Sequence, residues 1–169
     1  MTTASPPVRM PAWRLSRSAI WLWVTEGVLG TLANAVVVAA VLLFVPADDG
    51  VLSLVRWAVP VLAALYAVMA IGIRPFVRYR VHRWEVTAEA VYTLTGWLTR
   101  TWTLVPVARI QTVDVTRGVL QQLFGLASVA VLTASSQGTV RVPHLEAGVA
   151  ERVAEDLARR AEQVRDEAT

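Results

Sequence analysis

The chain has 169 residues, of which 55% are hydrophobic, and it contains no cysteine. The length leaves room for one small domain and a further segment, and the lack of cysteine excludes disulfide frameworks, thiolate metal sites and cysteine nucleophiles. All 16 basic residues are arginines and exceed the acidic residues by only three, so the charge alone does not predict a nucleic-acid-binding protein.

The first 18 residues combine three prolines and three arginines with several Ser and Thr residues, and they show no apolar period. Such a composition is typical of a segment without a packed core. We therefore predict a flexible tail over residues 1–18.

Two long apolar runs follow the tail. Gly27 to Val45 is an uncharged run, and its 19 residues would form a helix of about 28 Å, close to the hydrocarbon thickness of a bilayer. The second run, Val51 to Ile73, contains Arg56 near its start and Pro60 at a predicted kink. The short acidic turn between the runs requires an antiparallel pair, so we predict a transmembrane hairpin over residues 19–74, with spans at about 27–45 and 51–73.

A cleaved signal peptide is the alternative for the first run. The run is longer than a typical signal-peptide core and 26 residues precede it, which favours a membrane span. Arginines lie before the first span and after the second, and the connecting turn is acidic. The positive-inside rule therefore places both termini in the cytoplasm.

Small residues recur every fourth position in the first span. Such a stripe allows close approach of helices, and its predicted use is packing within the hairpin or self-association in the membrane. The stripe consists of Gly27, Thr31, Ala35 and Ala39.

The segment RPFVRYRVHR, residues 74–83, joins the membrane part to the rest of the chain. Arg74, Arg78, Arg80 and Arg83 give it a charge of +4. Arginines at this position either only enforce the topology or bind an anionic phospholipid headgroup, and Arg117 is a further candidate for headgroup binding.

From Tyr79 the helical period gives way to an alternation of apolar and polar residues, as in half-buried strands. From Glu146 the pattern becomes that of an amphipathic helix, with an apolar stripe of Val149, Val153, Leu157, Ala161 and Val164. These patterns predict an α+β membrane protein with an antiparallel sandwich or barrel over residues 75–165. The predicted strands are 82–87, 91–95, 99–105, 111–116, 128–133 and 139–142.

Residues 105–135, VPVARIQTVDVTRGVLQQLFGLASVAVLTAS, resemble the signature of bacterial PH-domain-containing membrane proteins of the YdbS/YdbT type. The matching residues are Pro106, Arg109, Ile110, Gln111, Arg117, Gly118, Phe124, Gly125 and Leu126. One departure is Gln122, where the family pattern leads us to expect a basic residue.

This resemblance implies two near-orthogonal antiparallel sheets closed by the C-terminal helix, in a multi-pass protein of the bacterial plasma membrane. It also implies a frequent partner, a larger relative that carries several such domains. A seventh strand, if present, is expected within residues 118–127, where the sequence shows no clean period.

Catalytic and metal sites are not predicted. The two histidines, His82 and His144, have no carboxylate cluster at metal-ligand spacing, and no phosphate-binding glycine loop occurs. We interpret His82 as a core residue and His144 as a residue at the strand-to-helix junction. No cofactor is expected, and nucleic acid is disfavoured because residues 84–145 carry a charge of only +1.

Two functions remain. The first is a non-catalytic interaction module that binds a protein partner, or its own copies, at the inner membrane face. The alternative is recognition of an anionic phospholipid headgroup by the juxtamembrane arginines.

Overall fold

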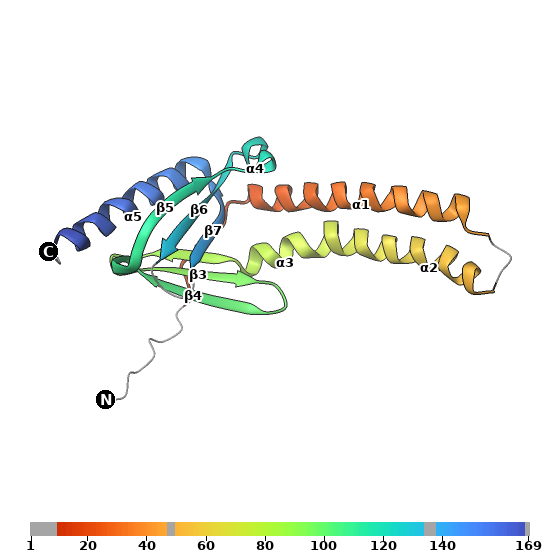
Figure 1. Cartoon of the computed structure of the whole chain (residues 1–169), viewed down its shortest axis with the longest axis horizontal. Coiled ribbons are helices and arrows are strands. Elements are labelled where there is room, and N and C mark those ends of the chain that lie inside the picture. Colours follow the sequence, from red (N-terminus) through yellow and green to blue (C-terminus); the bar gives the residue numbers. More distant parts are fainter. Residues whose placement is uncertain (1–9, 47–49, 134–137, 168–169) are drawn as a thin grey trace, which may run out of the picture. The chain divides into compact units, whose positions relative to one another are not determined.

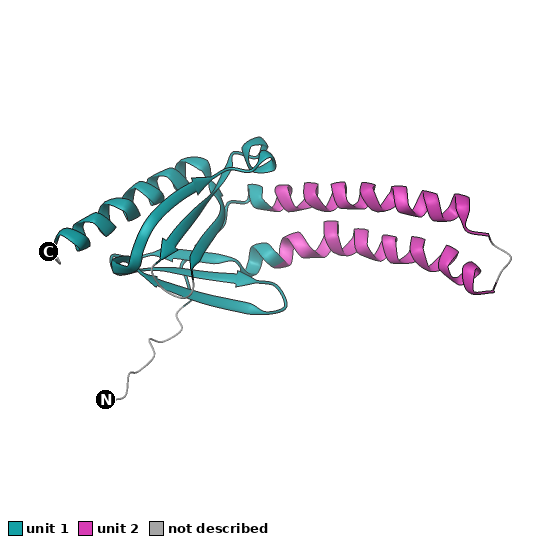
Figure 2. Cartoon of the chain, in the orientation of Figure 1, with its two compact units in different colours: residues 1–19, 78–169 teal, residues 20–77 magenta. Residues whose placement is uncertain are grey.

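The computed structural model describes residues 10–46, 50–133 and 138–167. The chain divides into two compact units, which Figure 2 distinguishes by colour. Unit 1, residues 1–19 and 78–169, contains the sheets, and unit 2, residues 20–77, contains the apolar helices. Residues 1–9, most of the predicted acidic turn and residues 134–137, between the last two predicted strands, lie outside the described residues.

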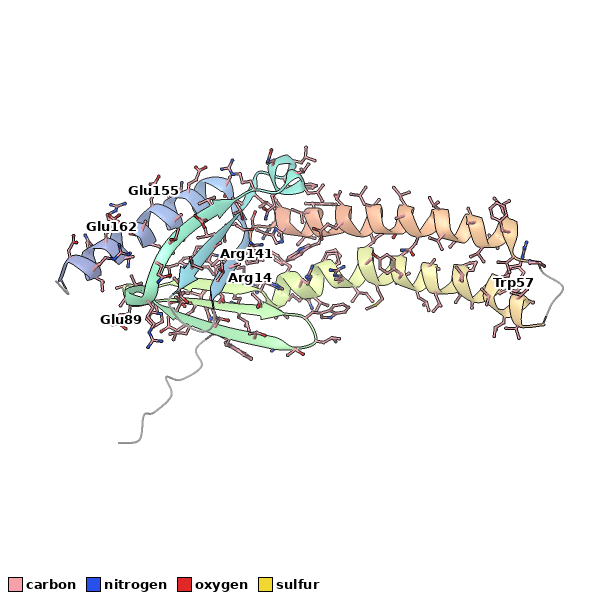
Figure 3. All side chains as sticks on the ribbon, in the orientation of Figure 1. Arg14, Trp57, Glu89, Arg141, Glu155 and Glu162 are labelled. Carbon is pink, nitrogen blue, oxygen red and sulfur yellow. The ribbon has the colours of Figure 1, made fainter. Side chains whose placement is uncertain are left out.

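The two apolar runs form two long helices. The first is α1 (Ser18–Phe44), and the second combines α2 (Gly50–Ala67), the π-helical turn η1 (Val68–Ile73) and α3 (Arg74–Val81). Both are long and apolar enough to cross a membrane, and only 6% of the most apolar window of each is buried. A core helix of a soluble protein would be mostly buried, whereas these helices expose large side chains such as Trp57 (Figure 3).

The second helix is longer than predicted. It continues to Val81, so the strand expected from residue 82 begins one residue later, and residues 79–81 are helical. Pro75 cannot donate a backbone hydrogen bond and would clash with the carbonyl four residues earlier. The wider π-helical turn directly before it accommodates this defect, and Arg74 keeps helical dihedral angles (φ −53°, ψ −46°).

Close contacts join the helices of unit 2. A Cβ atom on Gly27 would lie 2.6 Å from the Ala70 carbonyl oxygen, so only glycine fits there. At the other end, Arg56 donates a hydrogen bond of 2.6 Å to the carbonyl of Val45, just after the end of α1. Within α1, the Thr31 hydroxyl donates to the carbonyl of Gly27 at 2.8 Å.

The predicted stripe is only partly directed at the partner helix. Gly27 is buried and Thr31 is half-buried, but Ala35 and Ala39 are exposed. After Thr31 the half-buried position is Asn34 and not Ala35. An α-helix has 3.6 residues per turn, so a strict four-residue repeat moves gradually around the helix.

Unit 1 contains two antiparallel sheets and a C-terminal helix, as predicted for a PH-like α+β fold (Figure 1). The four-stranded sheet has the order β1-β2-β3-β4, and the three-stranded sheet has the order β5-β6-β7. The strands are β1 (Trp13–Arg14), β2 (Arg83–Val86), β3 (Ala90–Gly96), β4 (Arg100–Pro106), β5 (Ile110–Thr116), β6 (Leu126–Thr133) and β7 (Thr139–Glu146). Three helices complete the unit: η2 (Val107–Arg109), α4 (Val119–Leu123) and α5 (Ala147–Glu167).

The seventh strand is β1, which precedes the membrane helices. Trp13 pairs with Trp84 and Arg14 with Arg83, and Leu15 is buried. Two expectations are therefore wrong: residues 13–14 do not belong to a flexible tail, and residues 118–127 contain α4 and a turn instead of a complete strand. A two-residue strand gives no detectable alternation, so the sequence pattern could not reveal it.

The core lies between the sheets and beneath α5. Along β6 only Leu132 is exposed, so both faces of this strand are covered. The buried face of α5 is formed by Ala150, Ala154, Leu157 and Ala161, whereas Val149 and Val153 are half-buried and Val164 is exposed. The predicted stripe was therefore displaced by one residue in its first half, because small alanines and not the larger valines lie closest to the sheet.

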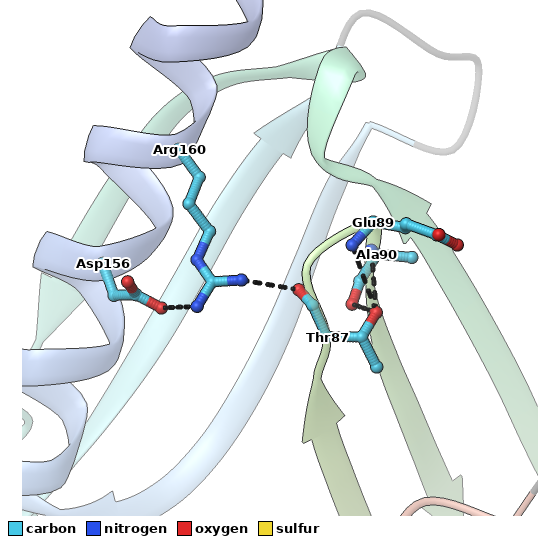
Figure 4. Close-up of polar contacts among 5 residues, drawn as sticks. All are labelled: Thr87, Glu89, Ala90, Asp156 and Arg160. Atoms are coloured by element: carbon cyan, nitrogen blue, oxygen red, sulfur yellow. Dashed lines mark hydrogen bonds and ion pairs between the residues drawn. The ribbon is translucent and has the colours of Figure 1, made fainter.

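Polar contacts of Arg160 hold the C-terminal half of α5. Arg160 forms an ion pair of 2.8 Å with Asp156 and donates to the Thr87 carbonyl at 3.3 Å (Figure 4). The Thr87 hydroxyl in turn accepts a hydrogen bond from the backbone N–H of Ala90 at 3.1 Å. The β2–β3 turn is thereby tied to the helix.

The Gly27 contact provides a stability test. We expect Gly27→Ala to destabilise the helical hairpin by about 1–3 kcal/mol, because its methyl group would overlap the Ala70 carbonyl. The matched control is Gly72→Ala, since nothing lies within 4 Å of a Cβ atom there. Thermal unfolding in detergent micelles measures both variants, and equal transition temperatures would contradict the proposed contact.

Candidate functional site: the juxtamembrane arginines and the α4 corner

The four predicted juxtamembrane arginines are divided between two elements. Arg74, Arg78 and Arg80 lie on α3, whereas Arg83 begins β2. Arg74 and Arg78 are one helical turn apart, but Arg80 lies on a different side of the helix and is exposed. The three arginines of α3 therefore do not form a single stripe.

Arg14 is a further basic residue of this region, which the sequence analysis missed as a site residue. It lies directly across the ladder from Arg83, so the two side chains project from the same face of the sheet. Like charges in directly opposed positions are destabilising, and a bound anion would relieve the repulsion. Only the pairing of β1 with β2 reveals this pair, because the two residues are 69 positions apart.

Arg117, the further candidate for headgroup binding, forms an ion pair with α5. Its guanidinium lies 2.5 Å from a carboxylate oxygen of Glu151 on α5. Gln122, the residue that departs from the family pattern, donates to the Arg117 carbonyl at 3.4 Å. Arg117 therefore ties the end of β5 to α5, and its charge is compensated within the unit.

The residues that carry the family resemblance form two connections. Pro106 ends β4, and Ile110 is buried at a break in the register where β5 begins. Gly125 has a left-handed conformation (φ +65°) and accepts a hydrogen bond from Ala147 at 2.9 Å. The remaining members Arg109, Gln111, Gly118, Phe124 and Leu126 lie in or beside the same two connections. The signature thus encodes the passage between the sheets and the α4 corner.

A polar network lies beneath α4. The Gln121 carboxamide accepts from the Gly118 backbone at 3.0 Å and donates to the Ser128 hydroxyl at 2.7 Å. The same carboxamide nitrogen lies 3.0 Å from Nδ1 of His144. Because a carboxamide nitrogen only donates, Nδ1 must accept, which identifies His144 as a neutral imidazole protonated on Nε2.

His144 occupies a strained position in β7. The strand contains an extra residue opposite Ser128, and His144 is the only non-glycine residue of the described chain with positive φ (53°). Burial, followed by the charges of Arg78 and His82, lowers the pKa of His144 to about 4. The predicted location at the strand-to-helix junction is wrong by two residues, because β7 continues to Glu146.

His82 is a buried residue, as predicted, with 8% of its surface exposed. Its Nδ1 lies 2.8 Å from the Arg78 carbonyl and must donate to it. Burial is the largest effect on the pKa of His82 and lowers it, and the Arg78 charge acts in the same direction. Both histidines are therefore neutral at physiological pH.

Two grooves open on unit 1. One, of about 360 Å³, is mainly apolar and includes Trp13, Leu15, Trp84, Leu145 and Val149. The other, of about 380 Å³, is lined by threonines of β3 and β4 together with Trp102 and Arg141. Within the described residues, no group of three or more His, Asp or Glu side chains could hold a metal ion.

Comparison with known proteins agrees with this architecture. Residues 27–161 match the family described as Bacterial PH domain. The chain is also similar to UPF0699 transmembrane protein YdbS of Bacillus subtilis (strain 168), with 31% identity over 106 residues. That alignment covers 61% of this chain and 65% of the relative, which is less than two thirds of the relative's length. No solved structure matches the chain.

The polar network predicts a pH dependence of stability. The pKa of His144 is about 4 in the folded chain and near the ordinary 6.5 in the unfolded chain, so the unfolded chain binds protons first as the pH falls. This contribution to stability is complete above pH 6.5 and is lost as the pH falls to about 4. His82 acts in the same direction, because its pKa is also lowered.

We therefore expect the apparent melting temperature in detergent to fall between pH 7 and pH 5. His144→Asn should weaken this dependence, because asparagine tolerates positive φ, can accept the Gln121 hydrogen bond and does not titrate. An unchanged pH profile in the Asn variant would show that His144 does not cause the dependence.

Proposed function

The chain belongs to the bacterial PH domain family, and we propose that it is a non-catalytic, membrane-anchored interaction module of the bacterial plasma membrane. Both termini face the cytoplasm, where the β-domain of unit 1 binds a protein partner. The partner is a membrane protein with related domains, and a second copy of this chain is the competing outcome. The β1–β2 pairing is the observation that carries the proposal.

The pairing leaves only short connections between the sheet and the membrane helices. Arg14 is separated from α1 only by residues 15–17, and Arg83 is separated from α3 only by His82. The segments on both sides of the transmembrane helices therefore enter one sheet.

The apolar groove is the best candidate for the docking face. Trp13 is 61% exposed at its edge, and half-buried Trp84 forms another wall. Exposed tryptophans beside an apolar depression are the residues on which protein interfaces most often depend. The adjacent side chains of Arg14 and Glu146 would supply a polar rim of both signs.

Trp13→Ala tests this assignment. We expect a loss of at least about tenfold in the amount of partner co-purified from native membranes in mild detergent, as for an interface hot spot. The matched control is Trp102→Ala, since Trp102 is also an exposed tryptophan beside a groove and lies on β4. Crosslinking that returns only monomer, with no co-purifying protein, would refute the interaction module.

Recognition of an anionic phospholipid headgroup is the second candidate. The opposed guanidinium groups of Arg14 and Arg83, together with the arginines of α3, favour it. Each arginine near an anionic surface contributes about 1 kcal/mol. The transmembrane helices already anchor the chain, so this energy would select the lipid and orient the domain.

Replacement of Arg74, Arg78, Arg80 and Arg83 by glutamine should deplete anionic phospholipid from the purified protein. Arg117→Gln is the control, because Arg117 is already paired with Glu151 and should not affect the lipid content. Mass spectrometry of the co-purified lipid measures both. A fourfold variant that keeps its anionic lipid would exclude headgroup recognition by these arginines.

A further inference from the structure

Two turns of unit 1 expose apolar side chains to an unusual degree. The first is the β3–β4 turn, residues 96–99, in which Leu98 is 88% exposed. The second is α4, in which Val119 is 77% and Leu123 is 75% exposed. We call these two segments the apolar turns. They do not belong to the core or to either groove described above.

The β3–β4 turn lies at one end of its sheet, the end at which β2 begins after the last membrane helix. Arg83, the first residue of β2, pairs with Leu94 near the end of β3. Since the strands are antiparallel, the turn that follows Leu94 projects beyond the start of β2. Only His82 separates that start from the end of α3.

The α4 corner lies at the same end of unit 1. Gln121 of α4 contacts His144, and the charge of Arg78 at the exit to the membrane helix helps to lower the pKa of this histidine. Figure 2 shows α4, the β3–β4 turn and both exits of unit 1 at one end of the teal domain. Glu89, in the β2–β3 turn, lies at the opposite end (Figure 3).

The composition of the apolar turns is also unusual for solvent-exposed connections. Such turns are normally rich in Asn, Asp, Ser, Gly and Pro. Here Gly96 supplies the required geometry (φ +125°), since a Cβ atom there would lie 1.9 Å from the Thr99 carbonyl oxygen, and the tip itself is Trp97-Leu98. Residues 92–104 contain one charged side chain, Arg100, and residues 118–126 contain none.

The length of the β3–β4 turn is compatible with contact with the bilayer. The predicted second span ends at residue 73, and the eight further residues to Val81 rise about 12 Å. The β3–β4 turn extends roughly 10 Å beyond the level of Leu94. The headgroup region of each leaflet is about 5–8 Å thick, so the extension of the turn exceeds the thickness of this region.

We propose that the apolar turns insert into the interfacial region of the bilayer that the transmembrane helices cross. Leu98, with Trp97 beside it, and Val119 with Leu123 would bury their side chains among the lipid. Tryptophan and leucine favour this depth, and Arg100 would remain at the phosphate level. The β-domain would then contact the membrane at two points besides its covalent connections.

The absence of native cysteine makes a direct test possible. Leu98→Cys and Val119→Cys are each labelled with an environment-sensitive fluorophore and reconstituted in vesicles of phosphatidylethanolamine and phosphatidylglycerol. Glu89→Cys, an exposed site at the far end of β3, is the matched control. Unchanged melting temperatures of the three variants establish that the substitutions leave the fold intact.

We expect the labels at positions 98 and 119 to emit at shorter wavelength in vesicles than in water. A quencher attached to the lipid acyl chains should reduce their emission, and aqueous iodide should quench them less than the label at position 89. Labels at all three positions that respond equally to iodide would overturn the proposal. A blue shift without lipid-dependent quenching would also overturn it, because it would place the turns in a protein interface.

Insertion depends on the membrane anchorage but not on a protein partner. The vesicles contain only this chain and lipid, so failure of the quenching experiment and failure of the Trp13 co-purification experiment are separate results.

Discussion

The pairing of β1 with β2 is the constraint on which the remaining structure depends. It brings together Trp13 and Trp84, which flank the membrane helices on opposite sides in the sequence. Without it, the domain would hang from a single connection after α3. With it, the chain leaves the sheet and returns to the same sheet, so the helical hairpin is an insertion within a β-domain and not a leader attached to one.

The arginines divide into groups that perform different physical tasks. Arg117 and Arg160 hold α5 through Glu151 and the Thr87 carbonyl, and Arg56 caps the end of α1. Arg14 and Arg83 oppose each other across a ladder, where neither compensates the other. The net charge of +3 does not reveal which arginines are compensated.

The sequence was sufficient for the elements whose residues repeat with a clear period. The apolar runs predicted both membrane helices, alternation predicted six strands, and the amphipathic pattern predicted α5. What failed depended on contacts between distant residues or on local defects. β1 is too short to show alternation, the π-helical turn before Pro75 extends a helix that looked complete, and the bulge at His144 shifts a strand boundary.

The candidate site was less predictable than the fold for the same reason. Arg78, Arg80 and Arg83 could be identified by their spacing after an apolar run, which is local information. The Arg14–Arg83 pair and the Arg117–Glu151 ion pair each join segments far apart in the chain. The family resemblance predicted the architecture of the connections but did not distinguish a structural arginine from one that binds a ligand.

Anchorage in a membrane lowers the free-energy cost of association with another membrane protein. Association of two proteins normally costs several kcal/mol of translational and rotational freedom, and restricting both to one membrane removes part of that cost. A flexible linker would return rotational freedom to the domain and lower the effective concentration of its docking face. Here only residues 15–17 and His82 separate the paired strands from the helices, so neither connection is a long linker. Under the proposed function, a modest surface such as the Trp13 groove would then be sufficient for specific binding.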